Sequence, residues 1–159
     1  MRWLLWFLLV PQLYLLQGWV GSTGQPLFDA TVLLCVFLAW FARPACLPVL
    51  LLGVAAGRAL VDDAGLAVQM LVVGTPTALV VPLRSIVFRR NWLWQGALAA
   101  VVAIVVPRLS GLLGAWFSQP SASAELHGAN VLWSALLVPP LLAVFRRLPP
   151  LRGFEEDLS

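Results

Sequence analysis

The chain has 159 residues, of which 61% are hydrophobic and only 11% are charged. A soluble domain of this length has too little interior to hide so much apolar surface, so the composition excludes a water-soluble globular protein and predicts a membrane protein. Ten arginines and seven carboxylates give a net charge of +3. No stretch interleaves aromatic and basic side chains as a groove for single-stranded nucleic acid does, so no nucleic-acid partner is expected.

Six apolar segments predict transmembrane helices, since a helix needs about 20 residues to cross about 30 Å of hydrocarbon. They lie near residues 3–20, 27–42, 45–61, 66–83, 92–106 and 129–145, and the segment 92–106 is the shortest. After it, residues 109–117 are apolar enough either to extend the fifth helix or to lie along the membrane interface. Residues 1–148 are therefore predicted to form one all-α six-helix transmembrane domain, and residues 149–159 a short acidic cytoplasmic tail.

The arginines fall almost entirely in alternate gaps between these segments. Eight of them share one side: Arg2, Arg43, Arg84, Arg89, Arg90, Arg146, Arg147 and Arg152. Only Arg58 and Arg108 lie near the other side. Because positively charged residues of short loops stay in the cytoplasm, both termini are predicted to be cytoplasmic.

The first segment also has a second interpretation, as a cleaved signal peptide. Arg2 followed by an apolar run has the charged and hydrophobic regions of such a peptide. Pro11, Gln12 and Gln17 interrupt the run, and no clear A-x-A cleavage site follows. We therefore expect the segment to be retained as the first span.

No catalytic or metal-binding motif is found. Cys35 and Cys46 are not expected to meet as a disulfide, and they lack the spacing of metal ligands. His127 is the only histidine, and one histidine without further nitrogen or sulfur ligands makes a poor metal site. We expect no enzymatic activity, no metal and no cofactor.

The third segment carries a G-x-x-x-G motif in which Gly53 and Gly57 share a helix face that another backbone can approach closely. A helix contact inside the fold is favoured over a dimer interface. Arg58 lies one helical turn before Asp62, a spacing that allows guanidinium and carboxylate to pair at the outer end of the helix. This pair is either self-satisfied at the membrane edge or available to a partner.

Prolines interrupt two of the predicted spans. In the fourth, Gly74-Thr75-Pro76-Thr77 predicts a kinked or locally opened helix, in which the threonines can bond freed carbonyls. Kinks of this kind line transport sites in some carriers, but they are more often packing features. Pro139 and Pro140 in the last span are interpreted in the same way.

In order along the chain, these motifs resemble the MreD family, small inner-membrane proteins of the bacterial rod-shape and wall-elongation machinery. The resemblance rests on an apolar second span opened by Pro26-Leu27-Phe28-Asp29, and on Gly53, Gly57, Asp62 and Gly65-Leu66 in order. It rests also on Asn91-Trp92-Leu93-Trp94-Gln95-Gly96-Ala97-Leu98 after an arginine-rich loop. The last helix resembles the family ending as well, with Ser134 and Pro139 followed by Phe145-Arg146-Arg147-Leu148. Three features depart from the family pattern. Val61 stands where the family aspartate is expected, so Asp62 comes one residue late, and the stretch from there to Gly65-Leu66 is shortened. Ser134 replaces the usual asparagine.

The resemblance implies a non-enzymatic scaffold that binds an MreC-like protein and works with MreB, RodA and a penicillin-binding transpeptidase. Our hypothesis is that Gly53 and Gly57 allow close approach of the partner's membrane helix. Arg58, Asp62 and Asp63 would supply an outer polar contact.

The family fold is also similar to the six-helix substrate-binding subunits of energy-coupling-factor transporters. The alternative function is therefore the substrate-binding membrane subunit of a vitamin-type transporter. A pocket for such a substrate needs convergent polar groups. The candidates are Gln69, Thr75, Thr77 and the pair of Arg58 and Asp62.

Overall fold

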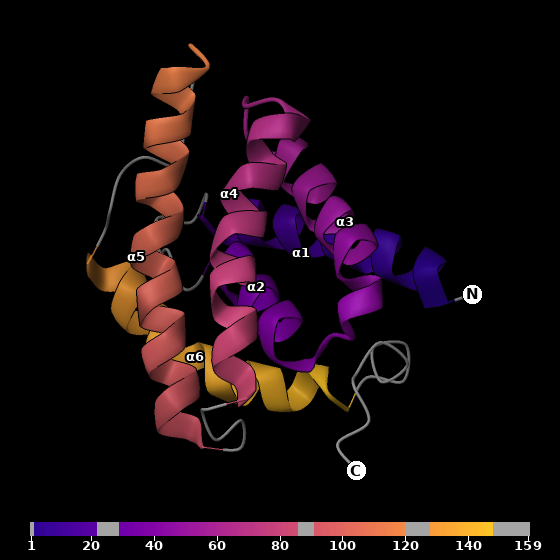
Figure 1. Cartoon of the computed structure of the whole chain (residues 1–159), viewed down its shortest axis with the longest axis vertical. Coiled ribbons are helices and arrows are strands. Elements are labelled where there is room, and N and C mark those ends of the chain that lie inside the picture. Colours follow the sequence, from indigo (N-terminus) through magenta and orange to yellow (C-terminus); the bar gives the residue numbers. More distant parts are fainter. Residues whose placement is uncertain (1, 22–28, 86–90, 120–127, 148–159) are drawn as a thin grey trace.

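The computed structural model describes residues 2–21, 29–85, 91–119 and 128–147, and its regular elements there are all helices (Figure 1). Six are α-helices, as predicted: α1 (Arg2–Gly21), α2 (Ala30–Phe41), α3 (Leu47–Ala59), α4 (Leu66–Val80), α5 (Trp92–Trp116) and α6 (Gly128–Phe145). Short 3-10 helices precede α3 (η1, Pro44–Cys46) and follow α4 (η2, Val81–Ser85). The predicted acidic tail, residues 149–159, lies outside the described residues.

In the described parts of the chain, four helices are long and apolar enough to cross a membrane: α1, α4 with part of η2, α5 and α6. By contrast, α2 and α3 have 12 and 13 residues. At about 1.5 Å per residue they measure about 20 Å, less than the hydrocarbon thickness of about 30 Å. The membrane character of the chain is therefore supported by four helices, while six spans and cytoplasmic termini stay predictions.

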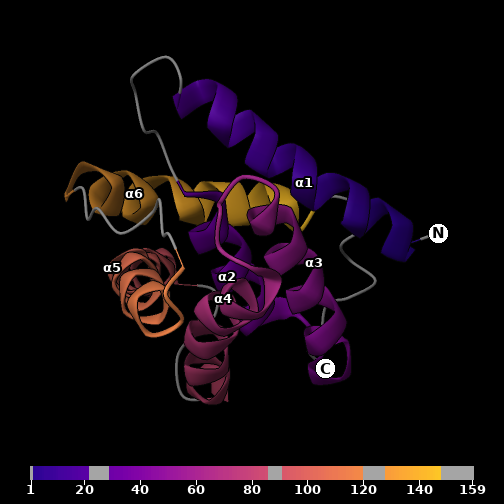
Figure 2. The same ribbon diagram turned by 90° about the horizontal axis from the view of Figure 1, so that it is seen from above.

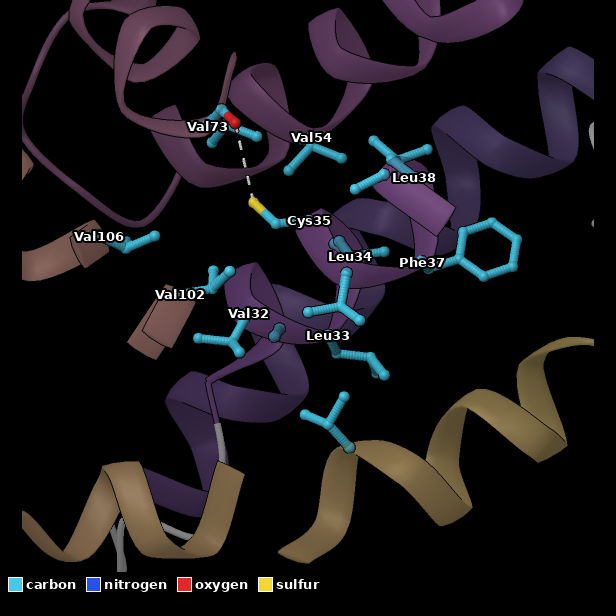
Figure 3. Close-up of a cluster of buried hydrophobic side chains, with 14 of the residues drawn as sticks. Val32, Leu33, Leu34, Cys35, Phe37, Leu38, Val54, Val73, Val102 and Val106 are labelled. Carbon is cyan, nitrogen blue, oxygen red and sulfur yellow. Dashed lines mark hydrogen bonds between the residues drawn. The ribbon is translucent and has the colours of Figure 1, made fainter. Parts of the chain in front are cut away.

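The short helix α2 lies at the centre of the fold. All 12 of its residues are buried, and it contacts each of the other five α-helices. The side chains drawn around Cys35 in Figure 3 come from α2 itself and from neighbouring helices, with Val54 on α3, Val73 on α4 and Val102 on α5. Its Phe37 ring packs against aromatic rings of α1 and α6, 6.4 Å from Trp6 and 6.0 Å from Phe145 between centroids. Helix α2 is therefore surrounded by other helices of the protein rather than by lipid.

The helices do not form a bundle with six parallel axes. Figure 2 shows α4 and α5 nearly end-on while α1 and α6 are seen along their length. In Figure 1, α6 accordingly runs crosswise to α5, against which it packs. The structure has the predicted number of helices, and two of the long ones run crosswise to the other two.

The fifth helix is longer than predicted. It continues through Pro107 to Trp116 and, with 25 residues, is the longest described helix instead of the shortest. The extension is one of the two alternatives that the apolar run 109–117 left open. Proline removes one helix hydrogen bond, but it need not end a helix in an apolar environment, because no water is present there to bond the other backbone N–H and C=O groups. Arg108 consequently lies inside α5 with an exposed side chain, rather than in a loop.

The fourth helix also continues through its proline, unbroken from Leu66 to Val80. The hydroxyl of Thr77 donates to the carbonyl oxygen of Val73 at 2.8 Å, one residue after Val72, whose carbonyl Pro76 leaves without its usual donor. The threonine therefore bonds its own helix, but not at the freed carbonyl that was predicted. The Cys35 thiol points at the same Val73 carbonyl, with Sγ 3.9 Å from the oxygen (Figure 3). The two cysteines are free, as expected.

Helices α5 and α6 approach each other closely at Gly96 of α5. A Cβ placed on Gly96 would lie 2.9 Å from the carbonyl oxygen of Ala135. In a helix that carbonyl would accept from the residue four positions later, which is Pro139 and has no N–H. The glycine hydrogens therefore face a backbone oxygen that helix α6 leaves without its usual donor, a geometry suited to a weak Cα–H···O contact.

We predict that Gly96→Ala lowers the free energy of unfolding by about 1–3 kcal/mol, the usual cost of overpacking against atoms that cannot rotate away. The matched control is Gly74→Ala in α4, because nothing lies within 4 Å of a Cβ at Gly74. That substitution should raise the free energy of unfolding by about 0.4–1 kcal/mol, because alanine leaves the unfolded chain less conformational entropy than glycine does. SDS titration followed by tryptophan near-UV circular dichroism measures both changes, and equal midpoints for the two variants would contradict the contact.

Candidate functional site

The G-x-x-x-G face of α3 is packed against α1 of the same chain. A Cβ at Gly53 would lie 2.7 Å from Nε1 of Trp6, and a Cβ at Gly57 would lie 2.8 Å from Cγ1 of Val10. The Trp6 side chain is fully buried, and its Nε1 donates to the carbonyl oxygen of Leu50 at 3.2 Å. The close approach predicted at the two glycines is thus made inside the fold.

This packing bears on the hypothesis that a partner helix uses the same face. Gly53 and Gly57 are both buried, and Tyr14 of α1 lies 3.0 Å from the Cβ position at Gly57. A second helix has no access to the glycines while α1 occupies them. Partner binding through these two residues stays a prediction that would require α1 to be displaced.

The predicted ion pair is present at the end of α3. Arg58 Nε lies 3.6 Å from Asp62 Oδ2, with the two side chains only 6% and 7% exposed. The backbone holds the spacing, because the N–H groups of Val61 and Asp62 both donate to the carbonyl oxygen of Arg58 as α3 ends. Removing two charges from water is costly, so a buried pair of this kind depends on both members.

Asp63 differs from the other four predicted partner residues because it is exposed, while Gly53, Gly57, Arg58 and Asp62 are buried. Its neighbours Leu60 and Val61 are exposed as well, at 71% and 51%. The turn after α3 therefore combines one carboxylate with two apolar side chains on an accessible surface.

The ion pair forms one wall of a polar cleft with a volume of about 230 Å³. The other walls come from α1 and from the start of α2, and the complete lining is Tyr14, Gln17, Gly18, Asp29, Thr31, Arg58, Val61 and Asp62. Three segments distant in sequence thus bring two carboxylates, a guanidinium, two hydroxyls and an amide to one place.

Hydrogen bonds at the start of α2 fix the cleft residues. Asp29 is the N-cap, and its Oδ1 accepts from the Thr31 N–H at 2.8 Å. Gln17 reaches across from α1 and accepts from the Ala30 N–H at 2.9 Å. The Tyr14 hydroxyl donates to Thr31 Oγ1 at 3.2 Å. Two of the helix's otherwise unpaired N–H groups are therefore satisfied by side chains that also line the cleft.

Sequence reasoning identified Arg58 and Asp62 but not Tyr14, Gln17, Asp29 and Thr31. A usable signal was present: Gln17, Asp29 and Thr31 are polar residues near the ends of the first two apolar segments that the arginine pattern places on the Arg58 side. No local pattern in the sequence shows which neighbouring helix each of these three side chains faces.

The other residues considered for a transport site do not join the cleft. Thr75 is exposed, and Thr77 is bonded to its own helix. Gln69 is fully buried on α4, and neither amide atom of its side chain has a hydrogen-bond partner among the described residues. Within the same part of the chain, no three His, Cys, Asp or Glu side chains gather as metal ligands would.

Comparison with known proteins yields no relative. No family model, no curated protein and no solved structure matches the chain.

We predict that Arg58→Met and Asp62→Leu each lower the free energy of unfolding by about 3–5 kcal/mol, because each leaves a buried charge without its partner. The double variant should recover much of this loss, since it buries two apolar side chains in place of the pair. The measurement is a double-mutant cycle by SDS titration.

The control for this cycle is Asp63→Asn, which removes a neighbouring but exposed carboxylate. It should change stability by no more than about 0.5 kcal/mol. Additive losses in the double variant would contradict the coupling between Arg58 and Asp62.

Proposed function

We propose that this protein is a non-enzymatic scaffold of the bacterial inner membrane that binds an MreC-like partner in the cell-shape and wall-elongation machinery. In this proposal the chain is an MreD-like protein with six spans and cytoplasmic termini. The proposal begins from the ordered motifs of the sequence, and the structure contributes one supporting observation. The interior around α2 is filled with apolar side chains, whereas the outer helix faces carry large exposed ones.

Exposed apolar side chains suit a protein that meets lipid and other membrane helices. On α1 they include Leu4, Leu8 and Trp19, and on α5 they include Trp92 and Leu93. In lipid, helices associate through packing and a few polar contacts rather than through hydrophobic burial alone. The polar contact that we propose for the partner is Asp63, because it is the accessible member of the predicted set.

The alternative, a vitamin-binding transport subunit, is less well supported. Pockets for molecules of that size usually measure about 300–1,000 Å³. The polar cleft has about 230 Å³, and Gln69, Thr75 and Thr77 do not line it. The energy-coupling-factor likeness therefore remains the second proposal.

The first test is purification of the tagged full-length chain from native membranes, followed by mass spectrometry of the proteins recovered with it. An MreC-like protein with wall-synthesis enzymes is the expected result. Recovery of a transport subunit with paired ATPases would overturn the scaffold proposal in favour of the alternative.

Asp63→Arg should lower recovery of the MreC-like partner several-fold, because it reverses the charge at the proposed contact. Ser118→Arg is the matched control, since Ser118 is exposed at the end of α5 and lies on the same predicted side as Asp63. Both variants add an arginine there, so they share any effect on insertion. Equal recovery with both variants would exclude Asp63 from the contact.

A further inference from the structure

The polar cleft carries one carboxylate on one wall and an ion pair on another. Asp29 stands at the start of α2, while Arg58 and Asp62 stand at the end of α3. The volume of about 230 Å³ is many times the ~10–15 Å³ that one water requires. The polar groups that cap α2 and pair at the end of α3 thus line a cleft that has room for a ligand larger than water, and charged groups of such a ligand can meet opposite charges there.

The surroundings of the cleft are apolar. Val61 lines it and is 51% exposed, Leu60 beside it is 71% exposed, and Trp19, which follows the lining residue Gly18, is 71% exposed. A cleft that has charged groups on its walls and opens among exposed apolar side chains fits an amphiphile better than a water-soluble solute. The polar group of such a molecule enters the cleft, and its hydrocarbon chains lie on the helix surfaces outside.

We propose that this cleft binds the headgroup of phosphatidylethanolamine, with the ammonium group against Asp29 and the phosphate against Arg58. The site lies at the end of α3, which the arginine pattern assigns to the outer leaflet. This inference does not depend on the scaffold proposal, because the headgroup contacts are argued from the walls of the cleft and its rim, and only the leaflet comes from the arginine pattern.

The charge balance selects this class of lipid. Two carboxylates and one guanidinium give the lining a net charge of −1, which disfavours an anionic headgroup such as that of phosphatidylglycerol. A primary ammonium can donate hydrogen bonds to Asp29 and to the oxygens of Tyr14 and Thr31, whereas the trimethylammonium of phosphatidylcholine has no N–H to donate. Arginine suits the phosphate because its fork of donors matches the phosphate oxygens.

The test is native mass spectrometry of the purified full-length protein in detergent. Phosphatidylethanolamine, phosphatidylcholine and phosphatidylglycerol with identical acyl chains are added separately, and free phosphoethanolamine is added as the soluble headgroup. We expect phosphatidylethanolamine to bind most tightly. Tight binding of either other lipid, or of free phosphoethanolamine to the same extent, would overturn the assignment.

Asp29→Asn sharpens the test, because asparagine caps a helix as well as aspartate does while lacking the charge. This variant should bind phosphatidylethanolamine about tenfold or more weakly, as expected for the loss of one charge-assisted hydrogen bond. Asp63→Asn, which removes a carboxylate outside the cleft, should bind as the wild type does. Unchanged binding by Asp29→Asn would refute the proposal, and the comparison of lipids on the wild type decides it even if that variant fails to fold.

Discussion

The fold depends on a helix that is too short to cross a membrane and yet is wholly enclosed. Both ends of α2 expose backbone groups, and inside an apolar protein each such group needs a partner. At the start, Asp29 and Gln17 accept from the first N–H groups. At the end, the guanidinium of Arg146 lies 4.7 Å from the ring centroid of Phe41, placing a positive charge near the negative end of the helix. Each end of α2 therefore has a charge of the complementary sign beside it.

This requirement connects the polar cleft with the packing of α1. Gln17 can reach Ala30 only if α1 crosses close to α2 and α3, and the two glycines of α3 permit that approach. Tyr14 illustrates the link, because its ring packs at Gly57 while its hydroxyl bonds Thr31 at the start of α2. Close apolar packing on one side of α1 thus positions the polar groups that line the cleft.

The sequence predicted what local patterns encode. Six helices, the pairing of Arg58 with Asp62, the free cysteines and the bond of Thr77 to its own helix all follow from spacing and composition, and the structure has them. The end of α5 was placed too early, because Pro107 and Arg108 resemble a boundary although the apolar run continues. The crosswise course of α1 and α6, and the contact of Gly96 with Ala135, depend on which faces meet, and no periodicity in one segment specifies that.

The position of Arg108 has a consequence for the lipid around α5. The exposed guanidinium of an arginine on an apolar helix extends toward the lipid headgroups. Its position on α5 therefore indicates where along the helix the boundary between hydrocarbon and headgroups would lie. Trp116 ends the helix eight residues later, about 12 Å further along its axis, and it is 81% exposed. With α5 placed across a bilayer in this way, its last two turns would lie in the headgroup layer, where exposed indoles are favoured, and the bilayer beside this helix would be thinner than the helix is long.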